Sequence, residues 1–438
     1  MRKIILPILF ISSLTFCQLA AADEGLKRGE LATWKFKIGG DERLRYEYRH
    51  DFNFNQNVRD SGKGYGTGSQ IFNRFRINAQ ALLSDEYLND IAEVFVEGLD
   101  GRVGSYQMKP MTAQKESFDL HQAYVNINEI LGSDFSFKIG RQELKYGAGR
   151  LVAAPTWANR IRSFDGAVLK YQTGNFYCDL LLASDAKYDD NNCNPINFRE
   201  KLTGFYAGYQ ENNVSPLIEV YYLPQIIHTD ASRSTRNTAG ARLKGRVPGN
   251  ILYDIEFPYQ FGKADHKTIK AYALHVDISH PFLSALWQPN VTFEYNQASG
   301  DNDPNDKMNN TFIPLYQSTH DPYGLMDFFR WQNMREVALR VDLFLTEKLK
   351  LTPQTNFLWL MSTNDSWYDS TGTALRNVKK GLRSYHVGQE VSLRASYDFN
   401  KNIKVETGYA HFFTGKYVAI SGANDDADWI YSQLNFKY

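Results

Sequence analysis

The sequence has few cysteines, no net charge and no long apolar run after its first residues. Its 438 residues include three cysteines, 49 basic side chains and 49 acidic side chains. Cys178 and Cys193 could form one bridge in an oxidising compartment, but two cysteines do not make a disulfide scaffold. The balanced charge excludes the strongly basic class of nucleic-acid-binding proteins, so we expect no nucleic-acid partner.

A membrane-spanning helix is also missing from the pattern. After residue 22 no apolar run reaches the ~18 residues that such a helix needs, and the mean hydropathy is −0.46. This absence excludes a helical membrane protein. It does not exclude a membrane β-barrel, whose strands need only ~10 residues of alternating polarity.

The first 22 residues have the composition of a secretory signal. Arg2 and Lys3 precede the apolar run 4–16, and Ala20 to Ala22 offer a small-residue cleavage site. Cys17 suggests lipid attachment, but the bulky Phe16 stands where a small residue is normally needed. We therefore predict a signal peptide at 1–22 and one domain at 23–438, with 47 basic and 49 acidic residues.

Alternation of apolar and polar residues dominates the rest of the chain. In segment 384–399 most odd positions are apolar, including Tyr385, Val387 and Val391, whereas His386, Glu390, Arg394 and Asp398 are polar or charged. Because side chains alternate across a strand, this segment has two different faces. We predict eighteen strands, at 33–49, 70–83, 90–99, 117–128, 135–144, 164–172, 175–185, 201–210, 216–225, 236–246, 250–262, 268–279, 286–297, 333–345, 348–361, 384–399, 402–413 and 428–438.

The connections between these strands alternate in length. Long ones cover 51–69, 100–116, 145–163, 186–200, 298–332, 362–383 and 414–427, and tight turns such as 173–175 and 400–401 lie between them. Outer-membrane barrels have short periplasmic turns and longer extracellular loops. The sequence therefore predicts an all-β, transmembrane, antiparallel up-and-down barrel in the outer membrane of a Gram-negative bacterium.

The barrel hypothesis assigns each strand face. Ile255, Phe257 and Tyr259 should meet lipid, while Asp254 and Glu256 should face the lumen. The same alternation directs Leu339 outward and Arg340 inward. It places His121 and His411 on lipid-facing positions and His386 in the lumen beside Glu390. Charged groups are costly in hydrocarbon, so a barrel requires this assignment.

Three segments carry a family resemblance. The first is 139–151 with 157–166, rich in arginine, glycine and acidic residues; the others are 293–306 and 323–333. Together they resemble the signatures of the outer-membrane alginate export family. That resemblance implies an eighteen-stranded barrel with an arginine-rich pore, in which arginines attract a polyuronate and carboxylates hold the arginines.

The resemblance and the strand faces give a set of candidate pore residues. Arginine suits carboxylate ligands because its guanidinium can donate two parallel hydrogen bonds. The structural alternative is that lumenal arginines and carboxylates simply pair across strands and keep the barrel rigid. The candidates are Arg74, Arg76, Arg141, Glu143, Arg150, Arg162, Asp165, Arg340, Glu390 and Arg394.

The predicted lumen carries both signs of charge. Glu93, Glu97, Glu256, Glu294 and Glu406 also point inward by alternation. A pore for a long polyanion should be biased positive, because charge of one sign concentrates the ligand. The mixed lining departs from the family pattern and favours a smaller or less charged solute than alginate.

Metal and catalytic motifs are weak. Asp301, Asp303 and Asn305 begin like a calcium loop, but the glycine and glutamate that an EF-hand needs are replaced by Asp306 and Phe312. We therefore expect no metal and no cofactor. A Ca²⁺ ion in this extracellular loop is the alternative to a solvated acidic loop. No Gly-x-Ser-x-Gly elbow accompanies the scattered histidines, so we predict that the chain is not an enzyme.

These observations predict a passive outer-membrane channel for an anionic polysaccharide, a sugar acid or a related solute. Its expected partners are outer-membrane lipid, the solute and periplasmic export proteins. The glycine-rich centre of loop 145–163 could fold into the lumen, and that loop or loop 298–332 could gate the pore. The alternatives are a general or anion-preferring uptake porin, an outer-membrane hydrolase and an adhesin barrel.

Overall fold

The computed structural model describes most of the chain after the predicted signal. The described residues are 32–52, 54, 66–85, 89–107, 114–189, 194–212, 214–229, 232–318, 320–378 and 381–438. The predicted signal peptide and Cys193 lie outside these ranges, so the signal and a bridge to Cys178 stay predictions. None of the helices in the described part is long and apolar enough to cross a membrane.

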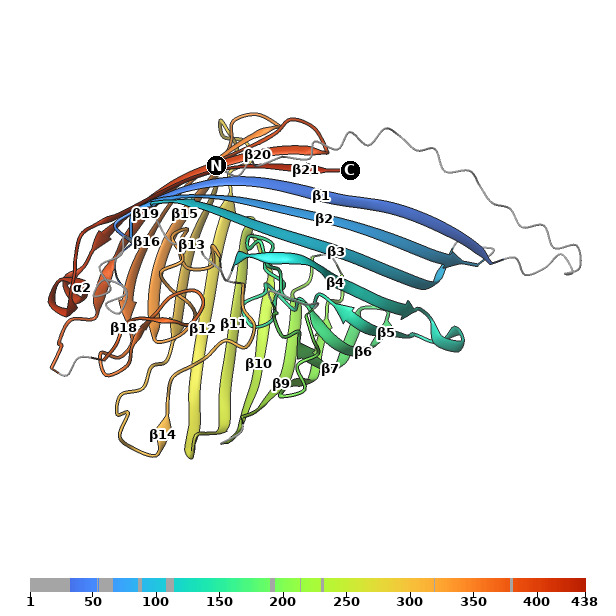
Figure 1. Ribbon diagram of the computed structural model, residues 1–438, viewed down its shortest axis with the longest axis horizontal. Helices are drawn as coiled ribbons and strands as arrows, with labels where there is room; N and C mark the ends of the chain where they lie inside the picture. Colours follow the sequence, from blue (N-terminus) through green and yellow to red (C-terminus); the bar gives the residue numbers. More distant parts are fainter. Residues whose placement is uncertain are drawn as a thin grey trace, which may run out of the picture.

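Eighteen long strands in the described ranges form the wall of a closed barrel (Figure 1). Each is antiparallel to the next along the chain, and β1 pairs with both β2 and β21, which closes the barrel. They are β1 (Thr33–His50), β2 (Gly68–Ser84), β3 (Asp90–Tyr106), β4 (Glu116–Ile127), β5 (Phe135–Gln142), β6 (Phe164–Thr173), β7 (Phe176–Asp185), β8 (Glu200–Tyr209), β9 (Leu217–His228), β10 (Arg233–Val247), β11 (Ile251–Ala264), β12 (Lys267–Pro281), β13 (Asn290–Ala298), β15 (Met334–Phe344), β16 (Leu349–Leu360), β19 (His386–Asp398), β20 (Ile403–Thr414) and β21 (Ala427–Lys437).

The predicted fold and strand order are confirmed. The largest difference in the wall is at β3, which continues to Tyr106 instead of ending at residue 99. Short elements that the sequence did not predict lie in the connections. These are η2 (Ile130–Gly132), β14 (Met308–Asn309), β17 (Trp367–Tyr368), β18 (Ala374–Arg376) and α2 (Lys416–Ser421).

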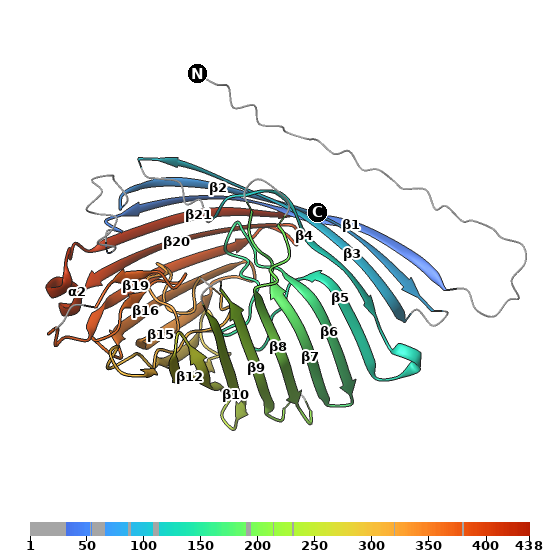
Figure 2. The same cartoon turned by 60° about the horizontal axis from the view of Figure 1, so that its bottom comes forward.

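Long connections and short turns lie at opposite ends of the barrel. The elements α2, β14 and β18 lie at one end of the strands, whereas the turn after β4 lies at the other (Figures 1 and 2). Two connections at the long-loop end are nevertheless tight, after β9 and after β11. By the length rule, we take the long-loop end as extracellular and the turn end as periplasmic.

The outer face of the wall is apolar and exposed. Phe257 and Tyr259 on β11 point outward, and Leu339 on β15 is 46% exposed although it is a large hydrophobic residue. The intervening Glu256 and Glu336 are buried inside. A row of exposed apolar side chains around a barrel is what contact with lipid requires.

Two β-bulges reverse the predicted face of particular residues. Along β16 and β19, Leu358 pairs with Gly388 but Trp359 pairs with His386, so Val387 is the extra residue. Val387 is therefore buried inside, and His386 packs against Trp359, 5.8 Å between ring centroids. The prediction that His386 faces the lumen is wrong, because alternation fails wherever one strand gains a residue.

The second bulge lies between β3 and β4. Glu97 pairs with Gln122 whereas Gly98 pairs with Leu120, which leaves His121 without an opposite residue. His121 is 4% exposed and bonded to lumenal carboxylates, so its predicted lipid-facing position is also wrong. His411, by contrast, lies on the outer face beside the exposed Phe413, as predicted.

The buried apolar core lies inside the barrel rather than between layers. Trp331, Trp367 and Phe312 belong to long connections and are fully buried. They pack with Phe412 and Tyr431 from the inner face of the wall. The extracellular half of the lumen is thus filled by loop residues.

Candidate functional site

Two long loops fold into the barrel and pair with each other. The first inner loop (residues 143–163) joins β5 to β6, and the second inner loop (residues 299–333) joins β13 to β15. The amide of Ala153 donates to the carbonyl of Tyr316 at 2.8 Å, and the amide of Tyr316 donates to the carbonyl of Leu151 at 2.6 Å. The prediction that the first loop enters the lumen is confirmed.

Arginines from β1 and β2 hold the first inner loop. Arg43 donates to the carbonyl of Trp157 at 2.5 Å, and Arg45 donates to the same oxygen at 2.7 Å. The guanidinium of Arg45 also lies 3.9 Å from a ring centroid of Trp157. Arg74, a predicted pore residue, donates to the carbonyls of Thr156 at 2.5 Å and Ala158 at 3.1 Å. Most hydrogen bonds of these arginines thus go to the backbone of the first inner loop.

Strand β19 holds the second inner loop through two other predicted residues. The carboxylate of Glu390 accepts the amides of Leu325 at 2.6 Å and Met326 at 3.1 Å. Arg394 donates to Asp321 at 2.6 Å. Both residues project inward as predicted, but their bonds go to the loop.

The two inner loops also meet through stacked rings near β21. The Trp157 ring stacks on the His320 ring with centroids 3.8 Å apart. The His320 imidazole lies 3.0 Å from the Asp327 carboxylate. Trp157 also meets Trp429 and Tyr431 edge-on. This ring cluster joins both loops to the wall.

A ladder of arginines and carboxylates covers the inner wall from β9 to β15. Arg242 bonds Glu219 and Asp254, each at 2.6 Å. Arg150 of the first inner loop reaches Glu256 at 3.1 Å and His275. Further along, Arg340 lies 3.8 Å from Asp277 and 3.9 Å from Glu294. Positive and negative groups alternate here, as the mixed lumen predicted.

The remaining predicted residues divide between the wall and the lumen. Arg141 bonds Asp165 at 2.8 Å and the carbonyls of Leu120 and Asn194. Its side chain thus ties β4, β6 and the connection after β7 together, and a pore role for Arg141 and Asp165 stays a prediction. Arg162 donates to the carbonyl of Ala153 and so supports the first inner loop.

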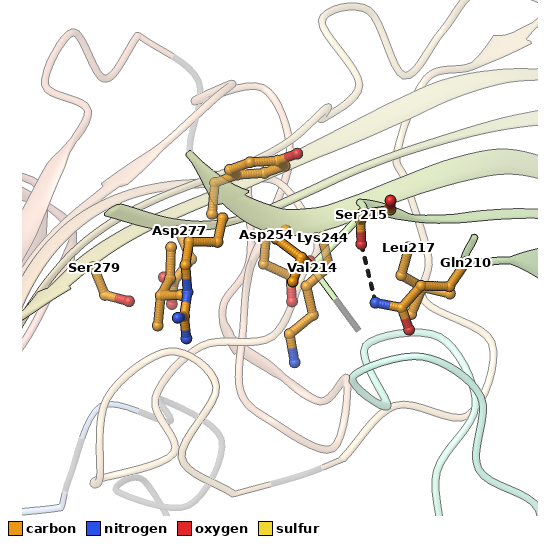
Figure 3. Close-up of a pocket in the computed structure, with 12 residues that line it drawn as sticks. Gln210, Val214, Ser215, Leu217, Lys244, Asp254, Asp277 and Ser279 are labelled. Carbon is orange, nitrogen blue, oxygen red and sulfur yellow. Dashed lines mark hydrogen bonds between the residues drawn. The ribbon is translucent and has the colours of Figure 1, made fainter. Parts of the chain in front are cut away.

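Two pockets remain open at the periplasmic end. The first pocket, which we call the vestibule, is lined by more residues than the second and has a volume of about 540 Å³. Its charged lining consists of six basic and four acidic side chains: Arg43, Arg74, Arg76, Lys401, Lys404, Lys437, Asp41, Asp321, Asp398 and Glu406. The second pocket, about 560 Å³, lies beside the ladder, with Lys244, Asp254 and Asp277 around it (Figure 3).

The sequence indicated some of these residues but not their roles. Arg43 and Arg45 alternate with apolar residues and so read as inward-facing, yet only the folded chain shows that they hold Trp157. Lys404 and Lys437 stand at strand ends near the turns, where charged residues are common. No local signal distinguishes them as vestibule residues.

The proposed calcium ligands form a hydrogen-bonded turn. The amide of Asp303 donates to Asp301 at 3.3 Å, and the amide of Asn305 donates to Asp303 at 3.0 Å. The amide of Asp301 donates to Asp365 at 2.9 Å. These bonds explain the acidic residues without an ion, and calcium binding stays a prediction.

Comparison with known proteins agrees with this geometry. A family model described as alginate export matches residues 35–428. No curated protein sequence matches the chain. Among solved structures, Pseudomonas aeruginosa OccK9 (OpdG) has a TM-score of 0.62 at 12% identity, covering 92% of this chain and 98% of that one.

Two other solved structures have the same fold. Pseudomonas aeruginosa OccK2 (OpdF) in complex with glucuronate has a TM-score of 0.60 at 10% identity, covering 92% of this chain and 97% of its own. Acinetobacter baumannii OccAB1 has a TM-score of 0.58 at 13% identity, covering 92% and 96%. At these identities the likeness establishes the barrel fold.

Proposed function

From the fact that this chain belongs to the alginate export family, and is thus a passive β-barrel channel of the bacterial outer membrane, we propose that its solute is a small sugar acid. A monomeric or short uronate suits the chain better than a long polyuronate. The family and fold are those of channels, and we assign the chain no catalytic step. Periplasmic export partners stay a prediction.

The observation that carries this proposal is the excess of basic groups in the vestibule. Arg43 and Arg74 are bonded to the first inner loop, and Arg76 is bonded to Asp41 through Nε and Nη2. The Nη1 atom of Arg76 stays beyond hydrogen-bond length of the nearest carboxylates, and Arg76, Lys404 and Lys437 line the open volume. Flexible lysines and a guanidinium offer the donors that a carboxylate binds. A positive vestibule raises the local concentration of anions at the periplasmic mouth.

The filled lumen supports a small solute. The two inner loops pair across the barrel and pack against Phe412 and Tyr431 of the wall. Beyond them the ladder neutralises most of its own arginines, as Arg242 does with Glu219 and Asp254. A continuous positive track for a long polyanion is therefore lacking in the described part of the lumen.

The structural neighbour with a bound uronate gives independent support. Pseudomonas aeruginosa OccK2 (OpdF) was solved in complex with glucuronate. Its identity to this chain is 10%, so the support concerns the class of barrel and not individual residues. A barrel of this class can therefore bind a sugar acid.

Planar-bilayer recording of the reconstituted protein tests the proposal. We expect an ohmic conductance that millimolar glucuronate or galacturonate reduces and that glucose at the same concentration leaves unchanged. The Arg76→Gln variant should weaken this block several-fold. The control is Arg335→Gln, which removes the same charge from an exposed side chain of β15.

Three results would contradict the proposal. Equal block by glucose and glucuronate would remove the preference for sugar acids. Block by long polyuronate alone, with monomers inert, would instead favour a polysaccharide channel. Equal effects of Arg76→Gln and Arg335→Gln on the block would show that the vestibule does not produce the preference for sugar acids.

A further inference from the structure

A group of metal-ligating side chains stands apart from the inner-loop contacts. Glu97 of β3, His121 of β4 and Glu143 at the start of the first inner loop place one ligand atom each within 4.8 Å of one another. It is the one such group of three among the described residues. We propose that these three side chains bind a divalent transition-metal ion such as Zn²⁺.

The spacing of the ligand atoms is close to what a metal needs. The Nε2 atom of His121 lies 2.9 Å from Oε1 of Glu143 and 3.9 Å from Oε1 of Glu97. Zinc binds nitrogen and carboxylate oxygen at about 2.0–2.2 Å, which puts tetrahedral ligand atoms roughly 3.3–3.6 Å apart. Side-chain rotations would bring the three ligand atoms to this spacing, and water can supply the fourth ligand.

The β-bulge builds this arrangement. Because His121 is the extra residue on β4, both His121 and its neighbour Gln122 point inward. Gly98 pairs with Leu120 beside this bulge, and a Cβ atom there would lie 2.4 Å from the ring of the exposed Phe118. Bulges interrupt strand pairing and are often found where a side chain must be re-aimed for function.

Gln122 is hydrogen-bonded to the side chain of one glutamate ligand and to the backbone of the other. Its amide nitrogen donates to Oε1 of Glu97 at 3.2 Å, and its amide oxygen accepts the backbone N–H of Glu143 at 3.1 Å. Partners of this kind fix the ligands of metal sites and raise their affinity. The bulge therefore contributes one ligand and the residue that positions the other two.

The nearest cation does not occupy the site. Arg76 uses Nε and Nη2 to bind Asp41, the former at 2.6 Å. Its Nη1 atom is 3.8 Å from Glu97 and 3.7 Å from Glu143, beyond hydrogen-bond length. The two carboxylates thus lie beside one histidine and one guanidinium that is too distant for a hydrogen bond. This environment favours a divalent ion.

The ligand types select the class of metal. One imidazole nitrogen with two carboxylate oxygens suits zinc and related transition metals, whereas calcium prefers a larger set of oxygen ligands. Glu97 and His121 are nearly buried and Glu143 is more open, with 28% of its side chain exposed. The ion would enter from the Glu143 side. This inference does not depend on the sugar-acid proposal.

Calorimetric titration of the detergent-solubilised, EDTA-stripped protein with ZnCl₂ tests the site. We expect one zinc ion per chain, and His121→Ala and Glu143→Gln should each weaken binding about ten-fold or more. His228→Ala is the matched control, since that histidine is exposed at the end of β9. All proteins should carry His50→Ala and His411→Ala, because those surface histidines contact Asp428.

A second measurement keeps the test independent of folding. Glu143→Gln preserves the shape of the side chain, and the heat-dependent gel shift of barrel proteins reports whether each variant is folded. Cobalt added in place of zinc should give the visible absorption of a protein-bound ion in the control variant and not in folded Glu143→Gln. Absence of zinc binding in the control, or equal binding by folded His121→Ala, would overturn the proposal.

Discussion

The two sides of the barrel use arginine in different ways. On the β9–β15 side, Arg242 is bonded to Glu219 and Asp254, and its charge is cancelled within the wall. On the β1–β2 side, Arg43 and Arg74 are bonded mainly to backbone carbonyls of the first inner loop. Carbonyl oxygens accept these hydrogen bonds without cancelling the charge. Arg43, and Arg74 with its 3.4 Å contact to Asp41, therefore keep more of their charge than Arg242 does.

The arginines of the ladder pair with carboxylates of the wall, whereas the arginines of β1 and β2 hold the first inner loop. The ladder braces the wall, and its loss should affect stability without moving a loop. The β1–β2 arginines connect the wall to the first inner loop, and their loss should alter the conductance. Replacing one residue from each side therefore tests the comparison.

The largest effect is expected for Arg45→Ala. Arg45 donates to the Trp157 carbonyl and pairs with Glu47 at 2.8 Å, and both side chains are almost fully buried. Its removal leaves the Glu47 carboxylate with Arg49 and the Trp429 indole N–H as partners, and breaking a buried pair costs about 3–5 kcal/mol. We expect a lower urea midpoint in denaturation followed by tryptophan fluorescence, together with a larger conductance.

Arg242→Ala is the counterpart on the other side. It should lower the urea midpoint by a similar amount, because Glu219 and Asp254 lose their partner. The mean conductance should change little, since Arg242 makes no hydrogen bond to either inner loop among the described contacts. An equal rise in conductance in both variants would contradict the distinction between the two sides.

Glu390→Ala should come next. The variant leaves the buried amides of Leu325 and Met326 without their acceptor, at about 1–3 kcal/mol for each unsatisfied group. The second inner loop should then detach more often, which limited proteolysis within 299–333 can measure. The control is Glu42→Ala, whose exposed carboxylate lies outside the lumen. Identical cleavage of both variants would argue against the anchor.

Gly324→Ala is expected to have a smaller effect. Gly324 has a φ of +94°, and a Cβ atom there would lie 2.7 Å from the Glu390 carboxylate. The left-handed backbone costs roughly 1–2 kcal/mol for a non-glycine residue, and the contact would displace the anchor. Gly174→Ala, at a φ of +52° in an open periplasmic turn, carries the backbone cost alone. Only Gly324→Ala should raise the conductance.

The smallest effect is expected on the outside of the wall. Arg102 bonds Asp100 in an exposed pair on β3. Exposed ion pairs contribute about 0–1 kcal/mol, so Arg102→Ala should leave both the urea midpoint and the conductance near those of the unmodified protein. A loss comparable to that of Arg45→Ala would mean that burial does not set the difference.

Much of the wall could be predicted from alternation alone. Lipid contact outside and charge inside repeat every second residue, so segments such as 251–261 reveal both the strand and its faces. Alternation fails at bulges, and for that reason His121 and His386 were placed on the wrong sides. An extra residue leaves no local mark in a sequence, since its cause is the register of the neighbouring strand.

The loops were less predictable for a different physical reason. The glycine-rich centre of the first inner loop suggested that it enters the lumen, but nothing local shows that Tyr316 pairs with Leu151 and Ala153. Likewise, Glu390 and Arg394 read as pore residues because they face inward. Whether an inward charge meets solute or loop depends on contacts between segments far apart in the chain.

The pairing of β1 with β21 joins strands that are far apart in the sequence, unlike every other pairing of long strands in the wall. Asp41 is opposite Lys437, and the amide of Tyr438 donates to the carbonyl of Gly40 at 3.2 Å. All other long strands pair with their neighbours in the chain, so those strand pairings form over short sequence separations. Joining distant segments carries the largest loop-closure entropy and slows folding. Until that seam forms, β1 and β21 each present an unpaired edge. The β1–β21 pairing should therefore be the step that governs insertion of the barrel into the membrane.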